Sequence, residues 1–208
     1  MRVLPYGPSA LLVELDSVDQ VRAVHSALRE AYRAGRLPDV VELVPAARTV
    51  LVAVRPGSSD LHAARAELSA VPLDRPPPAP SGPPLIVPVH YDGADLELVA
   101  RTANCSSAEV VSMHTGGVYT VAFCGFSPGF GYLTGLPAPL RQPRLDTARP
   151  EVPTGSVGIA DEFTGVYPRA SPGGWRLIGR TEMTLFDPSA QPPAALAPGR
   201  RVRFRAAS

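Results

Sequence analysis

A proline-rich segment divides the chain into two parts. Residues 72–84 read PLDRPPPAPSGPP and contain seven prolines without apolar periodicity. Proline fixes its own φ, donates no backbone hydrogen bond and restricts the residue before it, so this run is unable to form a helix or a central strand. We therefore predict an extended, semi-rigid linker over residues 72–84, between a first domain of residues 1–71 and a second of residues 85–208.

The first domain mixes β-rich and helical patterns. Residues 10–16 predict a strand, and residues 17–35 predict a helix that begins with a capping box of Ser17 and Gln20. Residues 39–54 predict a β-hairpin, and residues 60–71 a second helix. The order β-α-β-β-α is typical of a small two-layer α/β domain. The inner face of the first helix is predicted to carry Val21, Val24, Leu28 and Tyr32.

The second domain is predicted to be mainly β. A strand at 85–91 is followed by two short helices at 95–102 and 106–116, the second opened by a capping box of Ser106 and Glu109. Short β-runs between glycine and proline turns follow at 118–123, 155–160, 164–168, 175–180, 183–187 and 201–205. This spacing predicts a barrel or a sandwich, so the whole chain is α+β and mainly β.

Composition excludes several classes of function. All twenty basic residues among the 208 are arginine, which excludes a Schiff-base lysine, a phosphate-loop lysine and a biotin-carrying lysine in this chain. The net charge is +1 and the arginines are scattered, so we expect no nucleic-acid partner. No run approaches the ~20 apolar residues of a membrane helix, and no leader is evident, so we expect a cytoplasmic protein. Cys105 and Cys124 lack metal or redox spacing.

The stretch FCGFSPGFGYL, residues 123–133, combines aromatic rings with glycines. Its glycines permit positive φ and close backbone approach, and exposed amides in such a bend bind anions. We predict that Phe126, Pro128, Gly129 and Phe130 bind a substrate. The alternative is a loop that folds back to plug one end of the barrel.

A histidine and a Gly-Ser turn are further candidates for chemistry. His114, at the end of a short helix, is predicted to be a general acid or base, and the alternative is a histidine that caps the last helical carbonyls. Gly155 and Ser156 form a turn that is predicted to bind a substrate carboxylate or phosphate, although a serine that satisfies its own turn explains the pattern as well. The segment lacks the G-x-S-x-G pattern and no helix is predicted after Ser156, so the sequence does not favour a serine hydrolase.

Arg180 is predicted to pair with a carboxylate or phosphate. Strand alternation places Arg176, Ile178 and Arg180 on one face, so a partner surface is as consistent with the pattern as an interior site. Asp161 and Glu162 lie in a predicted solvated turn, and no spacing of His, Asp or Glu requires a metal.

The motifs YTVAFCGFSPGFGYLTGLP, PTGSVGIADEFTGVYPRASPGGWRLIGRT and LFDP resemble a known family. It contains the B-type subunit of the prokaryotic ATP-dependent 5-oxoprolinase, the sporulation-kinase inhibitor KipI and the allophanate hydrolase subunit 1 domain. YGPSALLVELD and VVELVPAARTVLVAV are similar to its N-terminal half, so the resemblance covers nearly the whole chain.

The resemblance implies a cyclophilin-like β-barrel after the linker and a smaller α/β domain before it. It also implies work with a homologous C-type subunit of the 5-oxoprolinase and with its A-type subunit. Together they convert 5-oxo-L-proline to L-glutamate with ATP and Mg. Alternatives within the family are a kinase inhibitor and a protein that acts on urea or a related amide. A prolyl isomerase is the weakest option, because a fold alone does not confer a function.

Overall fold

The structure is a computed structural model that describes residues 1–74 and 82–207. Most of the predicted linker, residues 75–81, lies outside the described residues. The chain divides into two compact units, Met1–Ala79 and Pro80–Ser208. The combination of a small α/β unit and a nearly closed mixed barrel confirms the predicted fold class.

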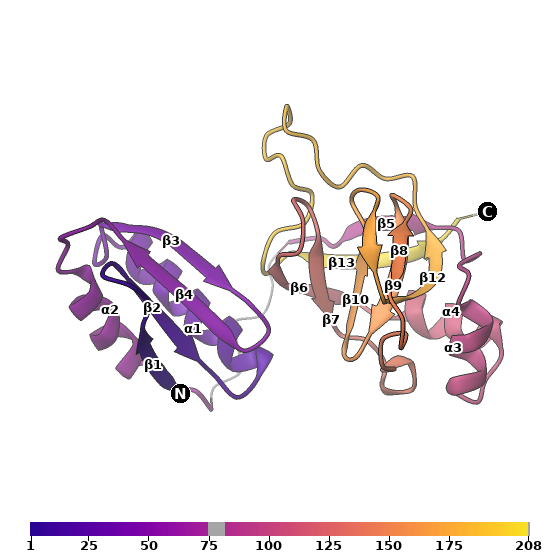
Figure 1. The fold of residues 1–208 in the computed structure, drawn as a ribbon, viewed down its shortest axis with the longest axis horizontal. Coiled ribbons are helices and arrows are strands. Elements are labelled where there is room, and N and C mark those ends of the chain that lie inside the picture. The colour runs from indigo at the N-terminus through magenta and orange to yellow at the C-terminus, as the bar shows by residue number, and fades with distance from the viewer. Residues whose placement is uncertain (75–81, 208) are drawn as a thin grey trace. The chain divides into compact units, whose positions relative to one another are not determined.

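The first unit is a four-stranded antiparallel sheet with two helices on one face (Figure 1). Its order in the sheet is β1-β2-β4-β3. Along the chain the elements are β1 (Arg2–Pro5), β2 (Ala10–Glu14), α1 (Val18–Arg33), β3 (Val40–Pro45), β4 (Thr49–Val54) and α2 (Asp60–Ser69). The edge strand β1 was not predicted, because four residues that end in proline carry little strand pattern.

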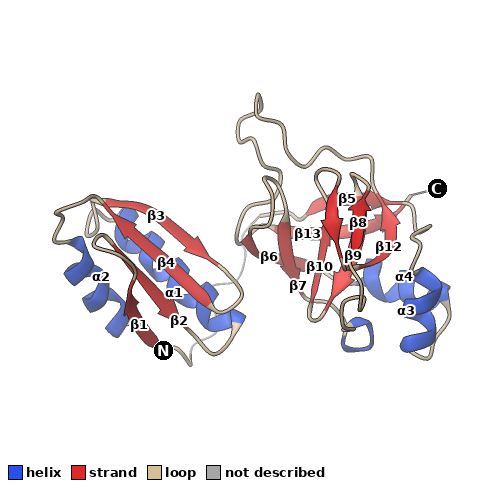
Figure 2. Cartoon of the chain, in the orientation of Figure 1, coloured by secondary structure: helices blue, strands red, loops and turns tan. Residues whose placement is uncertain are grey.

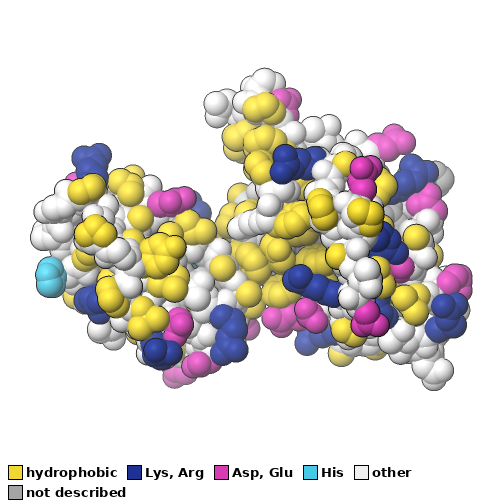
Figure 3. Space-filling view, in the orientation of Figure 1, with side chains coloured by type: hydrophobic (Ala, Val, Ile, Leu, Met, Phe, Trp, Pro, Cys, Tyr) yellow, Lys and Arg dark blue, Asp and Glu magenta, His cyan; other side chains and the backbone are white. Residues whose placement is uncertain are grey.

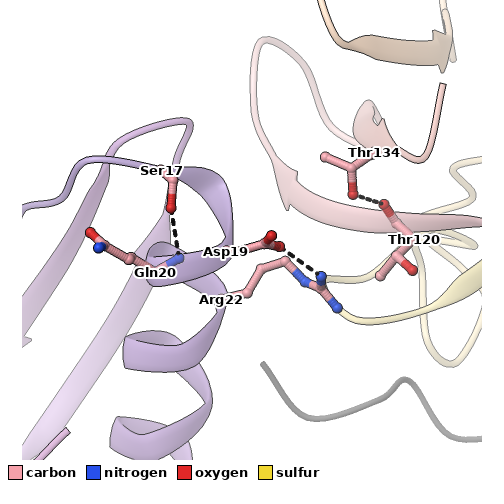
Figure 4. Close-up of polar contacts among 6 residues, drawn as sticks. All are labelled: Ser17, Asp19, Gln20, Arg22, Thr120 and Thr134. Atoms are coloured by element: carbon pink, nitrogen blue, oxygen red, sulfur yellow. Dashed lines mark hydrogen bonds and ion pairs between the residues drawn. The ribbon is translucent and has the colours of Figure 1, made fainter. Parts of the chain in front are cut away.

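Local sequence signals set the bounds of α1. The Ser17 hydroxyl accepts from the Gln20 amide at 3.3 Å (Figure 4). The Gln20 side chain accepts from the Asp16 amide at 3.0 Å. The predicted Ser17 cap is confirmed, but the predicted capping box is incomplete, because the Gln20 side chain accepts from Asp16 and not from Ser17. The predicted inner face is wrong at Tyr32, which is 49% exposed, because the helix packs through the buried Ala31 one position earlier. A small side chain there lets the helix approach the sheet.

The second unit contains a seven-stranded sheet in the order β12-β9-β10-β7-β6-β13-β5 (Figure 2). Its strands are β5 (Leu85–Val89), β6 (Tyr119–Cys124), β7 (Gly131–Thr134), β9 (Ser156–Ala160), β10 (Phe163–Val166), β12 (Arg176–Arg180) and β13 (Arg201–Ala206). The pair of β13 with β5 is parallel and the other pairs are antiparallel. The Thr134 hydroxyl also donates to the Thr120 carbonyl between β7 and β6 (Figure 4).

The sheet nearly closes into a barrel where its two edge strands meet. His90, just after β5, exchanges two backbone hydrogen bonds of 2.8 Å with Arg180 at the end of β12. A separate two-stranded sheet joins β8 (Arg149–Val152) and β11 (Ser171–Gly173). The predicted strand at 183–187 is wrong, because Phe186 is the one residue of this segment with a β-bridge among the described residues, and that bridge is to Ala194.

Two helices and one 3-10 turn complete the second unit. α3 (Leu96–Thr102) packs on β12, and α4 (Ser107–Gly116) packs on β13 and on α3. The capping box at the start of α4 is confirmed, since Ser106 and Glu109 bond each other's backbone amides. The 3-10 turn spans Ala138–Leu140.

The barrel unit has an interior core and a second cluster on its outer wall. The interior is filled by aliphatic side chains together with Tyr119 and Phe204. The outer cluster is aromatic and contains Phe130, Tyr167 and Trp175, with Tyr132 and Phe163 against it. Alternation along β7 explains the division, because Leu133 points inward while Tyr132 points outward.

Candidate functional site at the barrel rim

The glycine-rich stretch is only partly a loop. β6 ends at Cys124 and β7 begins at Gly131, so the loop covers residues 125–130. It is closed by a bond of 3.2 Å from the Gly125 amide to the Phe130 carbonyl, and another of 3.0 Å from the Phe130 amide to the Ser127 carbonyl. These bonds use some of the amides that were predicted to bind an anion.

The predicted aromatic residues of this loop have opposite environments. Phe130 is 1% exposed and packs edge-on against Tyr167 and Trp175 at 5.3 and 5.4 Å. Phe126 is 58% exposed and has a φ of +68°, which is rare outside glycine. Its ring still meets Phe130 and Tyr167 edge-on. Phe130 therefore belongs to the buried cluster on the outer wall, which is not the plug at the barrel end that the alternative expected, and Phe126 lies at the surface.

The outer aromatic cluster reaches the surface of the barrel. Phe123 stacks on Tyr132 at 4.3 Å, and Phe163 meets both rings edge-on. In the space-filling view, hydrophobic side chains gather over β6, β7 and β10, with basic and acidic side chains around them (Figure 3).

A pocket of about 300 Å³ lies next to this cluster. It is lined by Thr154, Tyr167, Pro168, Arg180, Thr181, Glu182, Met183 and Thr184. One predicted substrate-binding residue, Arg180, therefore lies in the pocket wall. The exposed Phe126 adjoins the pocket through its contact with Tyr167.

Two predicted glycines bring the walls of this pocket together. Gly155 has a φ of +80°, and a Cβ atom there would lie 2.1 Å from the Thr181 carbonyl oxygen. Its amide donates to the Tyr167 carbonyl at 2.7 Å, and its carbonyl accepts from the Thr181 amide at 2.8 Å. Gly129, with a φ of +84°, leaves room for Phe186 and Pro168 in the same way. Neither glycine is in the pocket lining, and both allow residues of its walls to approach closely.

Ser156 lies directly beside the pocket but does not line it. The residue is 5% exposed, its amide donates to the Pro153 carbonyl at 3.2 Å and its carbonyl accepts from the Tyr167 amide at 2.9 Å. Both are main-chain bonds that any residue could form, so they do not distinguish the predicted substrate role from the turn alternative. Pro128 is exposed in the neighbouring loop.

His114 lies inside the barrel, away from this pocket's lining. Its side chain is 0% exposed and stacks on Phe204 at 4.4 Å. Thr164 donates to the Gly158 carbonyl, so its oxygen accepts from His114 Nε2 at 3.0 Å, and His114 Nδ1 accepts from the Tyr91 hydroxyl at 2.7 Å. Burial lowers the pKa of His114 to about 3, so the ring is neutral. This geometry does not support the acid-base role predicted for His114.

The two arginines of β12 are not neighbours in one site. A register shift between Leu177 and Gly179 interrupts the alternation on which that expectation depended. Arg176 donates to Thr102 and to Gln142, whereas Arg180 Nε donates to Asp92 at 2.9 Å. Arg180 is therefore the arginine available at the rim.

Sequence reasoning missed most of the pocket wall. Thr154, Tyr167 and Glu182 come from three segments that only the closed barrel brings together. Two of these residues could have been found from their neighbours in the sequence. Thr154 directly precedes Gly155, and Glu182 follows Arg180 by two positions, and both neighbours were predicted to bind substrate.

Membrane-spanning and metal-binding features are both absent from the described part of the chain. No helix in residues 1–74 and 82–207 has the length and apolarity to cross a membrane. Within the same ranges, no group of three or more His, Cys, Asp or Glu side chains could hold a metal ion.

Comparisons with known proteins agree over nearly the whole chain. The family model "Carboxyltransferase domain, subdomain C and D" matches residues 1–196. A 5-oxoprolinase B-type subunit from Escherichia coli O157:H7 is 39% identical over 201 residues, which are 95% of this chain and 92% of that protein.

Solved structures share the fold. The crystal structure of TTHA0988 matches 96% of this chain with a TM-score of 0.81 and 33% identity. This chain spans only 40% of the TTHA0988 chain. A conserved protein, PH0987 from Pyrococcus horikoshii, matches over 100% of this chain and 98% of its own, with a TM-score of 0.59 and 34% identity.

Proposed function

Because the chain belongs to the family of 5-oxoprolinase B-type subunits, built on carboxyltransferase subdomains C and D, we propose that it is the B-type subunit of a prokaryotic ATP-dependent 5-oxoprolinase. It works with a homologous C-type subunit, together with the A-type subunit, to convert 5-oxo-L-proline to L-glutamate. The observation that carries this proposal is the 39% identity over nearly the full length of both the chain and the Escherichia coli protein.

The chain by itself does not fit a complete ATP site. It has no lysine to hold the β- and γ-phosphates, and its rim pocket of about 300 Å³ lies at the lower end of the range for ligand pockets. We therefore place the nucleotide and its Mg on another subunit, or at a site to which two subunits contribute. The isolated chain is then inactive.

Reconstitution tests the function. The chain is mixed with its purified A-type and C-type partners, and glutamate release from 5-oxo-L-proline is measured with and without ATP. We expect ATP-dependent release only when all three proteins are present. An omission series, in which each protein is left out in turn, is the control.

Three results would contradict the proposal. One is no turnover with three folded proteins that co-elute as a complex. A second is turnover of urea in place of 5-oxo-L-proline, which would assign the chain to the amide branch of the resemblance. Inhibition of a sensor histidine kinase by the free chain, with no glutamate release, would assign it to the inhibitor branch.

A further inference from the structure

The rim pocket has the size of a small-molecule site. Its volume is about 300 Å³, and its lining combines Tyr167, Pro168 and Met183 with five polar or charged residues, so it is more polar than most such sites. Small-ligand sites are typically concave, mostly apolar, and fitted with a few polar groups that fix orientation. The pocket is therefore suited to a small metabolite rather than to a nucleotide.

Arg180 enters this pocket from a fixed backbone. Its amide and carbonyl both bond His90 at 2.8 Å, at the point where the barrel closes. Its Nε donates to Asp92, and among the described residues no acceptor bonds its two terminal nitrogens. A guanidinium carries five N–H donors, so four of them remain for a ligand. Paired terminal nitrogens are the usual bidentate partner of a carboxylate.

The remaining polar groups complement a neutral amide. Glu182 forms no ion pair and no hydrogen bond among the residues that the structure describes, and the hydroxyls of Thr154 and Thr184 likewise have no protein partner there. Thr181 differs, because its hydroxyl accepts from the Met183 amide at 3.2 Å. A carboxylate accepts from an amide N–H, and a hydroxyl donates to an amide carbonyl. The pocket therefore offers partners for a lactam as well as for an acid.

We propose that this pocket binds a small cyclic amide that bears a carboxylate, with Arg180 holding the carboxylate and Glu182 accepting from the ring N–H. Thr154 or Thr184 donates to the ring carbonyl. The identity of the ligand as 5-oxo-L-proline rests on the proposed function. An ionised phosphate has no N–H group to donate to Glu182, so it would find a partner only in Arg180 and the threonine hydroxyls.

The test compares 5-oxo-L-proline with its carboxamide, which keeps the ring and loses the charge. Both are measured with the wild-type complex and with Arg180→Gln, by calorimetric binding and by turnover. We expect Arg180→Gln to weaken binding of the acid and raise its KM at least about 10-fold, with the carboxamide changed less than about 2-fold. The reason is that only the acid has a carboxylate to form a charge-assisted bond with the Arg180 guanidinium.

Two control variants separate binding from structure. Arg205→Gln removes an exposed arginine of β13 outside the pocket lining and should leave both ligands unchanged. Asp92→Asn breaks the ion pair but keeps Arg180, and it should retain the preference for the acid. If Arg180 matters only as the partner of Asp92, then Asp92→Asn will reproduce the Arg180→Gln defect, and the proposal is overturned.

Further outcomes show whether the pocket assignment or the proposed function has failed. An equal loss of both ligands in Arg180→Gln, or a defect that an excess of the C-type partner relieves, overturns the pocket assignment. If the wild-type complex binds the acid in an Arg180-dependent way but releases no glutamate, the pocket stands and the proposed function fails. If glutamate is released and Arg180→Gln keeps the acid preference, the function stands and the pocket assignment fails.

Discussion

At the residue scale, His114 shows how burial decides what a histidine can do. The ring is fully enclosed, and its neutral form satisfies both nitrogens through Tyr91 and Thr164. Its folded pKa of about 3 lies below the ordinary 6.5, so between these values the unfolded chain binds more protons than the folded one. Stability contributed by the neutral ring is present above pH 6.5 and is lost as the pH falls toward 3.

We predict that His114→Phe reduces this acid sensitivity. At about pH 7.5 the variant should be about 1–3 kcal/mol less stable, because Tyr91 and Thr164 lose a buried partner. The deficit should narrow as the pH falls to about 4.5, by at most about 1.4 kcal/mol per pH unit. Chemical denaturation at several pH values measures it, with the exposed His62→Gln as the control. A stability deficit that does not vary with pH would contradict the conclusion that His114 is buried in its neutral form.

The second prediction at the residue scale concerns the stability cost of a side chain at Gly155. Its positive φ and the 2.1 Å approach to the Thr181 carbonyl leave no space for a methyl group. Gly155→Ala should destabilise the barrel unit by more than about 2 kcal/mol, or displace the pocket wall. Gly125→Ala is the matched control, because nothing lies within 4 Å of its Cβ position. Thermal denaturation compares them, and equal melting temperatures would refute the constraint.

At the element scale, helix starts depend on a few side-chain bonds. Ser106 precedes α4 with an extended backbone and a complete capping box, whereas Ser59 precedes α2 with helical dihedrals and no side-chain cap. The sequence identified the first because the Ser-x-x-Glu pattern carries its own geometry.

This difference predicts unequal effects of two similar substitutions. Ser106→Ala should lower the free energy of unfolding by about 1 kcal/mol, and Ser59→Ala by less than about 0.5 kcal/mol. Denaturant titration of the two variants measures the difference. If both variants lose the same stability, the cap on α4 is not what fixes its start.

At the scale of the whole molecule, each unit contains its own hydrophobic core. The first unit buries the residues around Val13, Val24 and Val52, and the barrel unit buries a separate set around Tyr119 and Ile178. Among the described residues, no buried cluster combines residues of both units, so we treat residues 1–74 and 82–208 as separable domains.

We therefore predict that the two fragments fold when they are expressed apart. Each should unfold cooperatively, and the barrel fragment should keep the near-ultraviolet circular dichroism of its buried aromatic residues. The intact chain is the control for both signals. A barrel fragment without a cooperative transition would show that the first unit is required for its folding.

The sequence alone determined the features that short-range chemistry controls. Helix caps, the positions of most strands and the family follow from residues that are adjacent or regularly spaced. Arg180 was also predicted as a ligand residue, because a guanidinium at the end of a strand can pair bidentately with a carboxylate or phosphate.

Only the tertiary structure decided which predicted residues lie together. The barrel closes through the His90–Arg180 bridge, which brings Arg180 beside Thr154 and Tyr167 while it encloses His114. Burial and long-range contact depend on strand order and on the bulge in β12, and neither is encoded in local pattern. For that reason the same motifs yielded one pocket residue, two glycines that shape the walls and one histidine of the core.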